Sequence, residues 1–320
     1  MNKFGIPFLL TVFIFVFANS CVDPSLVPVV QTQNVTAITA TSATGWGNIS
    51  SNAGSAITGR GVCWNTKTKP TIANSKDTTN SGTGKYSVAM RGLTMGTKYY
   101  VRSYATNKNG TAYGDEVTFT TLVADYDGNI YHSVTIGNQV WMLENLKVTK
   151  YRNGNVISGV TDPTTWSGLT TGAYCSYNNI STNKATYGNL YNWYAVNDYR
   201  DIAPTGWHVP TQAEWTTLIN YLGTASVVGD LLKETGNSHW TGNYVGATNI
   251  SGFTALPGGY VALQNSAYAF YGIGTDGQWW SATEVDSGNA SKISLTNTSA
   301  QVVSGSGAKQ SGLSIRCIKD

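Results

Sequence analysis

The sequence predicts an antiparallel β-sandwich followed by a second, larger domain that contains at least one helix. Short alternating stretches, separated by Asn, Gly, Ser and Pro, run over about residues 29–122 and are typical of a sandwich. Further on, over residues 123–320, two hairpin signals and a helix-start signal followed by a helical apolar stripe occur. Charged residues make up only 12% of the 320 residues, so Ser, Thr, Asn and Gly must supply much of the polar surface, which suits short strands and loops.

The charge of the chain excludes one class of partner. The formal net charge is +3, and the Lys and Arg residues are scattered rather than clustered. Binding to nucleic acid requires a basic patch that can follow the phosphates. We therefore expect no nucleic-acid partner.

The N-terminus has the layout of an export signal. Lys3 precedes an almost unbroken apolar run over residues 4–17, and small residues then lead to Cys21. This order predicts a signal peptide over residues 1–20, with Cys21 as the lipid acceptor of a bacterial lipoprotein and residues 21–28 as a lipidated tether. The alternative is an ordinary signal peptide with an unmodified cysteine. With lipidation, the protein would be an outer-membrane lipoprotein of the cell envelope, facing the periplasm or the exterior.

Several short stretches make up the predicted sandwich of about seven strands. They are Thr36–Ala40, Ala43–Ile49, Gly61–Trp64, Tyr86–Met90, Lys98–Tyr104 and Ala112–Phe119. Trp46, Cys63 and Trp64 are expected to lie in the core or on a sheet face.

One segment gives the sandwich a family resemblance. Residues 93–101 resemble the tyrosine-corner segment of fibronectin type III domains, in which a tyrosine hydroxyl bonds back to the backbone. Tyr99 is the expected corner residue. Nearly all of residues 29–122 resembles the fibronectin type III-like repeats common in Bacteroidetes envelope proteins, which implies a spacer.

The second domain opens on Asp125 and Asp127, whose spacing allows two interpretations. A calcium loop needs more oxygen ligands at set distances. Asp127-Gly128 between two strand-like runs instead favours a hairpin. Residues 134–142 predict a second hairpin that closes on Trp141.

The clearest helix signal is a capping box. The Thr211 hydroxyl and the Glu214 carboxylate can each satisfy a free amide of the first turn. Gly223 supplies the stop. A shorter helix is expected around residues 190–196. The apolar stripe of the long helix consists of Trp215, Leu218, Ile219 and Leu222.

Several blocks in the second domain occur together and in order. They are residues 136–142, 144–146, 172–175, 187–195, 206–211, 280–281 and 315–317. In this order they resemble the Fibrobacter succinogenes major paralogous domain, over almost all of residues 123–320. That family is similar to C-type-lectin-like folds and, more distantly, to the formylglycine-generating enzymes. The resemblance implies an α+β, C-type-lectin-like domain with long loops.

The specific activities of those relatives do not carry over. Sugar-binding C-type lectins place a Glu-Pro-Asn or Gln-Pro-Asp loop and a Trp-Asn-Asp segment around calcium. Neither is present: residues 196–198, Val-Asn-Asp, resemble only the second segment and lie too early in the chain. The formylglycine-generating enzymes need a paired cysteine site that is missing. Cys175 and Cys317 fall in the matching blocks, and export would allow a disulfide between them. The alternative is two reduced, buried thiols.

The sequence offers no catalytic, metal or cofactor site. It has no Gly-x-Ser-x-Gly elbow, no phosphate-binding loop and only three dispersed histidines. His208 is expected to make a structural hydrogen bond ahead of the helix. We therefore predict no enzyme activity, no metal and no cofactor.

Aromatic residues in polar loops remain as candidate ligand contacts. Aromatic faces beside amide and hydroxyl groups can stack on sugars or bind proteins, although such residues often cap a core instead. The candidates are Trp166, His239, Trp240, Tyr244, Tyr268 and Tyr271. The tryptophans of the matching blocks are expected in the core: Trp141, Trp193, Trp207, Trp215 and Trp280.

Three functions follow in order of preference. The first is a non-catalytic binding or adhesion module for glycans or for host or fibre polymers. The second is a structural component that binds other envelope proteins. The third is an uncharacterised hydrolase, which would need a histidine–carboxylate cluster that the sequence does not reveal.

Overall fold

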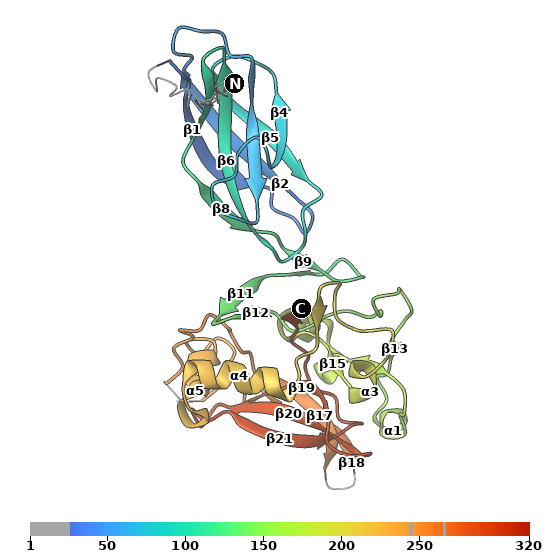
Figure 1. Ribbon diagram of the computed structural model, residues 1–320. Coiled ribbons are helices and arrows are strands. Elements are labelled where there is room, and N and C mark those ends of the chain that lie inside the picture. Colours follow the sequence, from blue (N-terminus) through green and yellow to red (C-terminus); the bar gives the residue numbers. More distant parts are fainter. Residues whose placement is uncertain (1–25, 243–245, 265–266) are drawn as a thin grey trace, which may run out of the picture. The chain divides into compact units, whose positions relative to one another are not determined.

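The computed structural model describes residues 26–242, 246–264 and 267–320 (Figure 1). Cys21 and Tyr244 lie outside the described residues. The chain divides into two compact units, of which the first contains residues up to 34, 45–88 and 100–117. The second contains residues 118–320 together with 35–44 and 89–99. The boundary predicted between residues 122 and 123 stays a prediction.

The first eight strands form a β-sandwich. One sheet has the order β1-β2-β5, and the other has the order β4-β3-β6-β7 with β8 paired to β6. This is a fibronectin type III-like arrangement, as the sequence predicts. The strands are β1 (Val29–Thr36), β2 (Ser42–Ser51), β3 (Gly59–Asn65), β4 (Ser75–Thr79), β5 (Gly84–Arg91), β6 (Lys98–Asn107), β7 (Gly110–Tyr113) and β8 (Val117–Thr120).

Three strand predictions need correction. The stretch Ala112–Phe119 contains two strands, β7 and β8, separated by residues 114–116. In the stretch Thr36–Ala40, Thr36 is the last residue of β1 and residues 37–40 form a turn, because Ala37 has a positive φ of 48° and the Thr39 hydroxyl accepts the amide of Ser42 at 2.9 Å. The strand at this place, β1, precedes the turn. The edge strand β4 was missed because its sequence, SKDTT, has no apolar alternation and its side chains are mostly exposed.

The tyrosine corner is confirmed. The Tyr99 hydroxyl accepts the backbone amide of Thr94 at 3.0 Å, and the Tyr99 ring stacks on Phe119 with ring centres 5.7 Å apart. The ring is buried, so the hydroxyl needs a partner. The bond ties the start of β6 to the turn that precedes it.

A second tyrosine connects the two sheets of the sandwich, and its ring leaves room only for glycine at position 47. The Tyr86 hydroxyl lies 3.0 and 3.1 Å from the carbonyl oxygens of Gly61 and Tyr104 in the other sheet. A Cβ at Gly47 would lie 2.5 Å from the Tyr86 ring. Only glycine therefore fits in the middle of β2 beside this ring.

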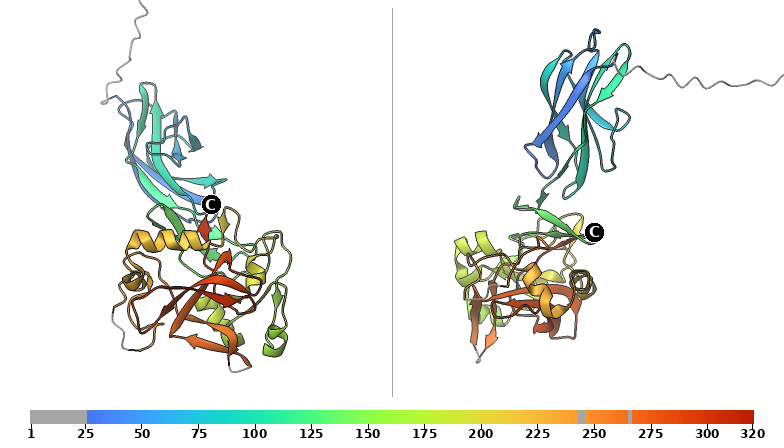
Figure 2. Two further views of the ribbon diagram at one scale, coloured as in Figure 1. Left: turned by 60° about the horizontal axis from the view of Figure 1, so that its bottom comes forward. Right: turned by 90° about the vertical axis from the view of Figure 1, so that its left-hand side faces the viewer.

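The C-terminal region, defined here as residues 123–320, contains both strands and helices (Figure 2). Its short strands are β9 (Val123–Ala124), β10 (Ile130–Tyr131), β11 (Ser133–Ile136), β12 (Gln139–Met142), β13 (Ser158–Gly159), β14 (Ala173–Cys175), β15 (Leu190–Tyr191), β16 (Trp207–His208) and β22 (Ile318–Lys319). Its longer strands are β17 (Gly258–Gln264), β18 (Ala267–Ile273), β19 (Asp276–Glu284), β20 (Asn289–Thr296) and β21 (Val303–Ala308). Its helices are α1 (Pro163–Ser167), the 3-10 turn η1 (Tyr177–Asn179), α2 (Ser181–Tyr187), α3 (Trp193–Val196), α4 (Gln212–Leu222) and α5 (Ala225–Leu232).

Both predicted hairpins of the C-terminal region are confirmed. The first pairs β9 with β10, and the second pairs β11 with β12. Asp125 holds the first turn, because its carboxylate accepts the amides of Asp127 and Asn129 at 3.0 Å each, and the Tyr131 hydroxyl at 2.5 Å. These bonds use the Asp125 oxygens within the turn and support the hairpin interpretation over the calcium loop.

The long strands form one sheet, in the order β18-β17-β19-β20-β21, and β22 lies inside a second sheet of order β11-β12-β22-β16. Helices α4 and α5 pack beside the five-stranded sheet (Figure 1). Trp215 and Leu218 of α4 are buried in one cluster with Trp279 of β19. The predicted helix, its stripe and its capping box are therefore confirmed.

A buried arginine occupies the interior of the C-terminal region. The Arg316 guanidinium is 0% exposed and donates to the Asn145 side-chain oxygen at 3.0 and 3.1 Å and to the backbone oxygen of Phe253 at 2.5 Å. The same Asn145 oxygen accepts the Trp279 indole N–H at 2.8 Å. Burial lowers the pKa of Arg316 to about 9, so the group is still charged at neutral pH. We call Asn145, Trp279 and Arg316 the interior network.

The predicted disulfide between Cys175 and Cys317 does not form. Both cysteines, like Cys63, are free and buried. Cys175 lies in a core cluster with Trp166 and Val261, whereas Cys317 lies in a separate cluster around Met142 and Trp207. Burial raises the pKa of the Cys175 thiol to about 12 and raises that of Cys317 well above its ordinary value, so neither is a ready thiolate.

Candidate functional site: a polar cleft beside His208

A polar cleft of about 330 Å³ lies in the C-terminal region, between the loop after α3 and strands β16 and β19. This volume is at the lower end of the range of about 300–1,000 Å³ found for small-ligand sites. Its lining residues are Val196, Asn197, Asp198, Tyr199, Asp201, His208, Val209 and Ala282.

The wall of the cleft begins where α3 ends. Asn192 caps the start of α3, because its side-chain oxygen accepts the amides of Ala195 at 3.2 Å and Ala173 at 2.9 Å. The helix then stops at Val196, and the chain turns outward through Asn197. This short, capped helix fixes where the cleft loop starts.

Two ion pairs hold the cleft loop in place. Arg200 binds Asp198 through two parallel bonds of 2.7 and 2.6 Å, and its guanidinium lies 4.1 Å from the centre of the buried Tyr151 ring. Bonds from Arg200 lower the pKa of the Asp198 carboxyl. Asp201 pairs with Arg152 at 2.8 Å. Both carboxylates that line the cleft therefore have a cationic partner.

Tyr199 lies between the two members of the first ion pair, Asp198 and Arg200, and its ring is in solvent. It is 93% exposed, the most exposed of the large apolar and aromatic side chains among the described residues. Its neighbours Asp198 and Arg200 are bonded to each other and hold the backbone on both sides of it. An aromatic face presented by an anchored loop at the rim of a polar cleft is suited to stacking on a ligand.

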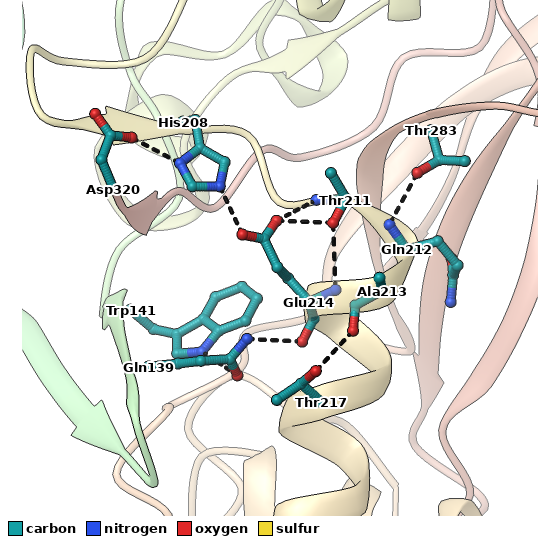
Figure 3. A network of polar contacts seen from close by, with 10 residues as sticks. All are labelled: Gln139, Trp141, His208, Thr211, Gln212, Ala213, Glu214, Thr217, Thr283 and Asp320. Carbon is teal, nitrogen blue, oxygen red and sulfur yellow. Dashed lines mark hydrogen bonds and ion pairs between the residues drawn. The ribbon is translucent and has the colours of Figure 1, made fainter.

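His208, which also lines the cleft, forms a bridge between two carboxylates (Figure 3). Its Nδ1 lies 2.7 Å from Asp320 Oδ1, and its Nε2 lies 2.8 Å from Glu214 Oε1. A neutral imidazole can donate from one nitrogen, so both bonds form together with the protonated ring. The Glu214 carboxylate also accepts the Thr211 amide at 2.8 Å, which completes the predicted capping box.

The bridge changes the pKa values of its members. Partial burial alone would lower the pKa of His208, but the hydrogen bonds to Asp320 and Glu214 outweigh it and raise the pKa above the ordinary value of 6.5. Burial likewise tends to raise the pKa of Glu214, whereas bonds from Thr211 and His208 lower it below 4.5. Both shifts favour the ion-paired form.

This arrangement limits the chemistry of the cleft. Both His208 nitrogens are occupied by carboxylates, so the ring has no free lone pair to accept a proton or bind a metal. The Thr211 hydroxyl, the nearest possible nucleophile in this network, bonds the Glu214 carboxylate at 2.9 Å. The cleft therefore presents paired charges, an amide and an aromatic face rather than a reactive group.

The other two histidines are also paired with glutamates. His132 lies 2.7 Å from Glu144, and His239 lies 2.7 Å from Glu234. Over residues 26–242, 246–264 and 267–320, no group of three or more His, Cys, Asp or Glu side chains is arranged to hold a metal ion. In the same ranges, no helix has the length and apolar character needed to cross a membrane.

Two of the predicted ligand contacts are wrong because they lie in the core. Trp166 is 2% exposed, and its indole N–H donates to the backbone oxygen of Gln310 at 2.6 Å. Trp240 is 5% exposed, and its indole N–H donates to the backbone oxygen of Ala255 at 2.9 Å. A Gly- and Thr-rich local sequence does not reveal that the rest of the chain covers these rings.

The other predicted contacts stay predictions. The His239 ring lies edge-on to Tyr187, with ring centres 5.7 Å apart. Tyr268 packs partly buried against the cluster around Trp166, and Tyr271 lies beside Tyr260 with ring centres 5.7 Å apart. None of the described members of the predicted set lines the cleft.

The sequence analysis missed Tyr199. A signal was present, since Tyr199 lies between Asp198 and Arg200 just after a short predicted helix. A paired Asp-x-Arg around an aromatic residue indicates an anchored loop tip, but the sequence alone does not show that Asp198 and Arg200 bind each other.

Fold and site together define a β-rich protein in which a fibronectin type III-like sandwich precedes a mixed domain with a polar cleft. Residues 134–319, more than half of the chain, match the Fibrobacter succinogenes major domain, so the chain belongs to that family. The resemblance drawn from the sequence blocks is thereby confirmed for this domain. No curated protein matches the chain significantly.

Solved structures similar to the chain match less than a third of it. One is the sensor domain of the anti-sigma factor RsgI4 in Pseudobacteroides cellulosolvens, with 18% identity, 29% of this chain and 93% of that chain covered, and a TM-score of 0.23. Another is a fibronectin type III domain derived from human KIAA0970 protein, with 13% identity, coverages of 30% and 75%, and a TM-score of 0.23. A segment of titin has 21% identity, coverages of 30% and 31%, and a TM-score of 0.21.

Proposed function

We propose that this protein is a non-catalytic binding module of the cell envelope, and that the cleft beside His208 binds a neutral glycan. The observation that carries the proposal is Tyr199, a 93% exposed ring on a loop anchored by ion pairs at the rim of a polar cleft. The Arg200 guanidinium lies 5.8 Å from the centre of the Tyr199 ring, and the rest of the ring is open to solvent. Such an exposed ring is suited to the apolar face of a sugar.

The charge of the cleft supports a neutral ligand. Asp198 and Asp201 are paired with arginines, and His208 is paired with two carboxylates. A phosphate or sulfate would have to compete for guanidinium groups that are already bonded. The Asn197 side chain and the backbone can still bond hydroxyl groups, which fits polyols such as sugars.

The cluster at His208 bears on the enzyme alternative. A histidine–carboxylate cluster is the feature that would favour a hydrolase, and the C-terminal region contains one. Its geometry instead fits a structural bridge, since both imidazole nitrogens are used and the network holds no free nucleophile. We therefore propose a non-catalytic role.

The ligand proposal is tested on a glycan array with the full chain and with Tyr199→Ala. We expect binding to a neutral glycan by the parent and a clear loss in the variant. Tyr221→Ala is the matched control, because Tyr221 is also exposed, at 65%, but does not line the cleft. Equal binding by parent and Tyr199→Ala, or an empty array with folded protein, would refute the proposal.

We also propose that the protein is held at the outer membrane by a lipid on Cys21, that it faces the periplasm or the exterior, and that its second domain belongs to the C-type-lectin-like fold group. The support for the anchor is the export-signal layout before Cys21, and the support for the fold group is the resemblance carried by the sequence blocks of residues 123–320. Metabolic labelling with a palmitate analogue should label the parent and not Cys21→Ser. Label that persists in Cys21→Ser would contradict the anchor.

A further inference from the structure

Strand β21 is the outermost strand of the five-stranded sheet (Figure 1). Its sequence, VSGSGA, has neither charge nor proline, and five of its six residues are exposed. It pairs with β20 without a bulge over all six residues. Uncharged, straight edge strands are open to pairing with another strand, and proteins usually protect them with charges, prolines or bulges.

Three other edge strands, β18, β4 and β1, differ from β21. At the opposite edge of the same sheet, α1 packs against β18, and Phe270 and Tyr268 join the cluster around Trp166. In the sandwich, the edge strand β4 carries Lys76 and Asp77, and strand β1 is contacted at Thr32 by the amide of Ser103. Strand β21 has no comparable protection among the described residues.

The hydrogen bonds around β21 show which of its backbone groups face outward. The Lys309 amide donates to the Gly288 oxygen at 2.9 Å, so that pair is bonded. Bonds in an antiparallel ladder alternate, so Gly307 and Gly305 also bond towards β20, whereas Ser304, Ser306 and Ala308 point away from it. Two outward groups near the ends are occupied: the Val302 amide donates to Ala225, and the Ala308 oxygen accepts from Ser311.

An open stretch centred on Ser306 therefore remains. For the outward amides of Ser304, Ser306 and Ala308, the described part of the chain shows no acceptor. We propose that β21 of a second copy of this chain pairs here, antiparallel, with the two Ser306 residues opposite each other. The pairing would join two five-stranded sheets through about four backbone hydrogen bonds, those of the Ser306 and Ala308 amides of each copy, because the Ala308 oxygen already accepts from Ser311.

A second copy fits this edge better than an unrelated strand for two reasons. First, the open stretch is symmetric about Ser306, since Ser304 would face Ala308 and Ala308 would face Ser304. Second, residues 304–308 are Ser, Gly and Ala, which are small and uncharged. An identical strand therefore meets neither a clash nor a like charge there. A partner selected by its side chains would need pockets that Ser, Gly and Ala do not provide.

The first test changes one backbone donor. Ser306→Pro removes an amide that points away from β20, so the ladder inside the sheet keeps its bonds. Pairing across the edge loses two bonds, one from each copy, and meets the proline ring. Ser306→Ala, which keeps the amide, is the control. In ultracentrifugation of the full chain in density-matched detergent, we expect a dimer for the parent and for Ser306→Ala. For Ser306→Pro we expect a dissociation constant raised at least about tenfold, with an unchanged melting temperature.

A second test fixes the register. Ser306→Cys places two thiols opposite each other across the two-fold axis, within reach of a disulfide. In Ser304→Cys the two thiols are four residues apart along the strands, about 13 Å, and cannot bond. We expect a covalent dimer on non-reducing gels only for Ser306→Cys. A monomeric parent, a dimer that survives Ser306→Pro, or equal cross-linking of both cysteine variants would each overturn the proposal.

Discussion

The interior network and the cleft loop each hold one arginine in a fixed position, but with different kinds of hydrogen-bond acceptor. Arg316 is buried and keeps its charge, and it is held by uncharged acceptors, chiefly the Asn145 oxygen. Arg200 lies near the surface and binds a full carboxylate, Asp198. The residues of the interior network lie in or beside the recognisable sequence blocks, whereas Tyr199 lies outside them. The residues of the blocks hold the interior network and one wall of the cleft, at His208 and Val209, whereas the exposed ring proposed to bind the ligand lies outside the blocks.

The largest effect is expected in the interior network. Asn145→Leu removes the oxygen that accepts both Arg316 and Trp279, so a buried charge and an indole N–H lose their partner. We expect the free energy of unfolding to fall by about 3–5 kcal/mol, measured by urea denaturation. Asn145→Leu combined with Arg316→Met should recover part of the loss, because the buried charge is then gone. If the single variant were as stable as the parent, the contrast drawn above would fail.

The capping box of α4 should have a smaller effect. Thr211→Ala removes the side-chain acceptor of the Glu214 amide, which should cost about 1 kcal/mol of unfolding free energy. Thr217→Ala is the matched control on the same helix, since its exposed hydroxyl donates only to the Ala213 oxygen. The control should change stability by less than about 0.5 kcal/mol. Equal stability of the two variants would show that the capping box does not stabilise α4.

The His208 bridge should give a pH dependence. The pKa of His208 is raised on folding, so its contribution to stability is complete below its ordinary value of 6.5 and is lost as the pH rises through the folded value. The pKa of Glu214 is lowered, so its contribution is lost as the pH falls below 4.5. The bridge should therefore stabilise most between these two values. Melting curves of the parent and of His208→Gln should differ most in this window and converge at higher pH; a constant difference would contradict the bridge.

The cleft loop should respond in binding rather than in stability. Tyr199→Ala should leave the melting temperature unchanged, since the ring is 93% exposed. For any glycan that the array identifies, titration calorimetry should show affinity reduced by a factor of about 2 to 12, as expected for the loss of one stacked ring. A large drop in stability would mean that the loop supports the frame after all.

No effect at all is expected from reduction. Because Cys175 and Cys317 are free, a reducing agent should leave the melting temperature unchanged. Alkylation of the unfolded, unreduced chain should label both thiols, as judged by intact mass. A mass shift on reduction, or a lower melting temperature in the reducing agent, would show that the disulfide forms.

Local signals predicted local structure well. The capping box at Thr211, the hairpin at Asp127-Gly128 and the tyrosine corner at Tyr99 each depend on a few consecutive residues, and each is confirmed. Burial was predicted for the tryptophans of the sequence blocks but not for Trp166 and Trp240. Their surroundings come from Gln310 and Ala255, far along the chain in the first case and across a loop in the second.

The candidate site depends on distant pairings that one sequence does not contain. His208 meets Asp320 across more than a hundred residues, and Arg152 meets Asp201 across about fifty. The disulfide failed for the same reason, since lying within two family blocks does not place Cys175 near Cys317. The polar strand β4 had no apolar pattern to find, because its side chains face water.

The position of β22 has a consequence for how the chain matures. This strand lies between β12 and β16, and in the described chain β16 pairs with β22 alone. A chain that is synthesised from its N-terminus can fold the sandwich early, but the sheet around β22 must wait for residues 318–319. Until then, the backbone groups of β12 and β16 that β22 will satisfy stay available to other strands, so we expect holding chaperones to act on this domain and not on the sandwich.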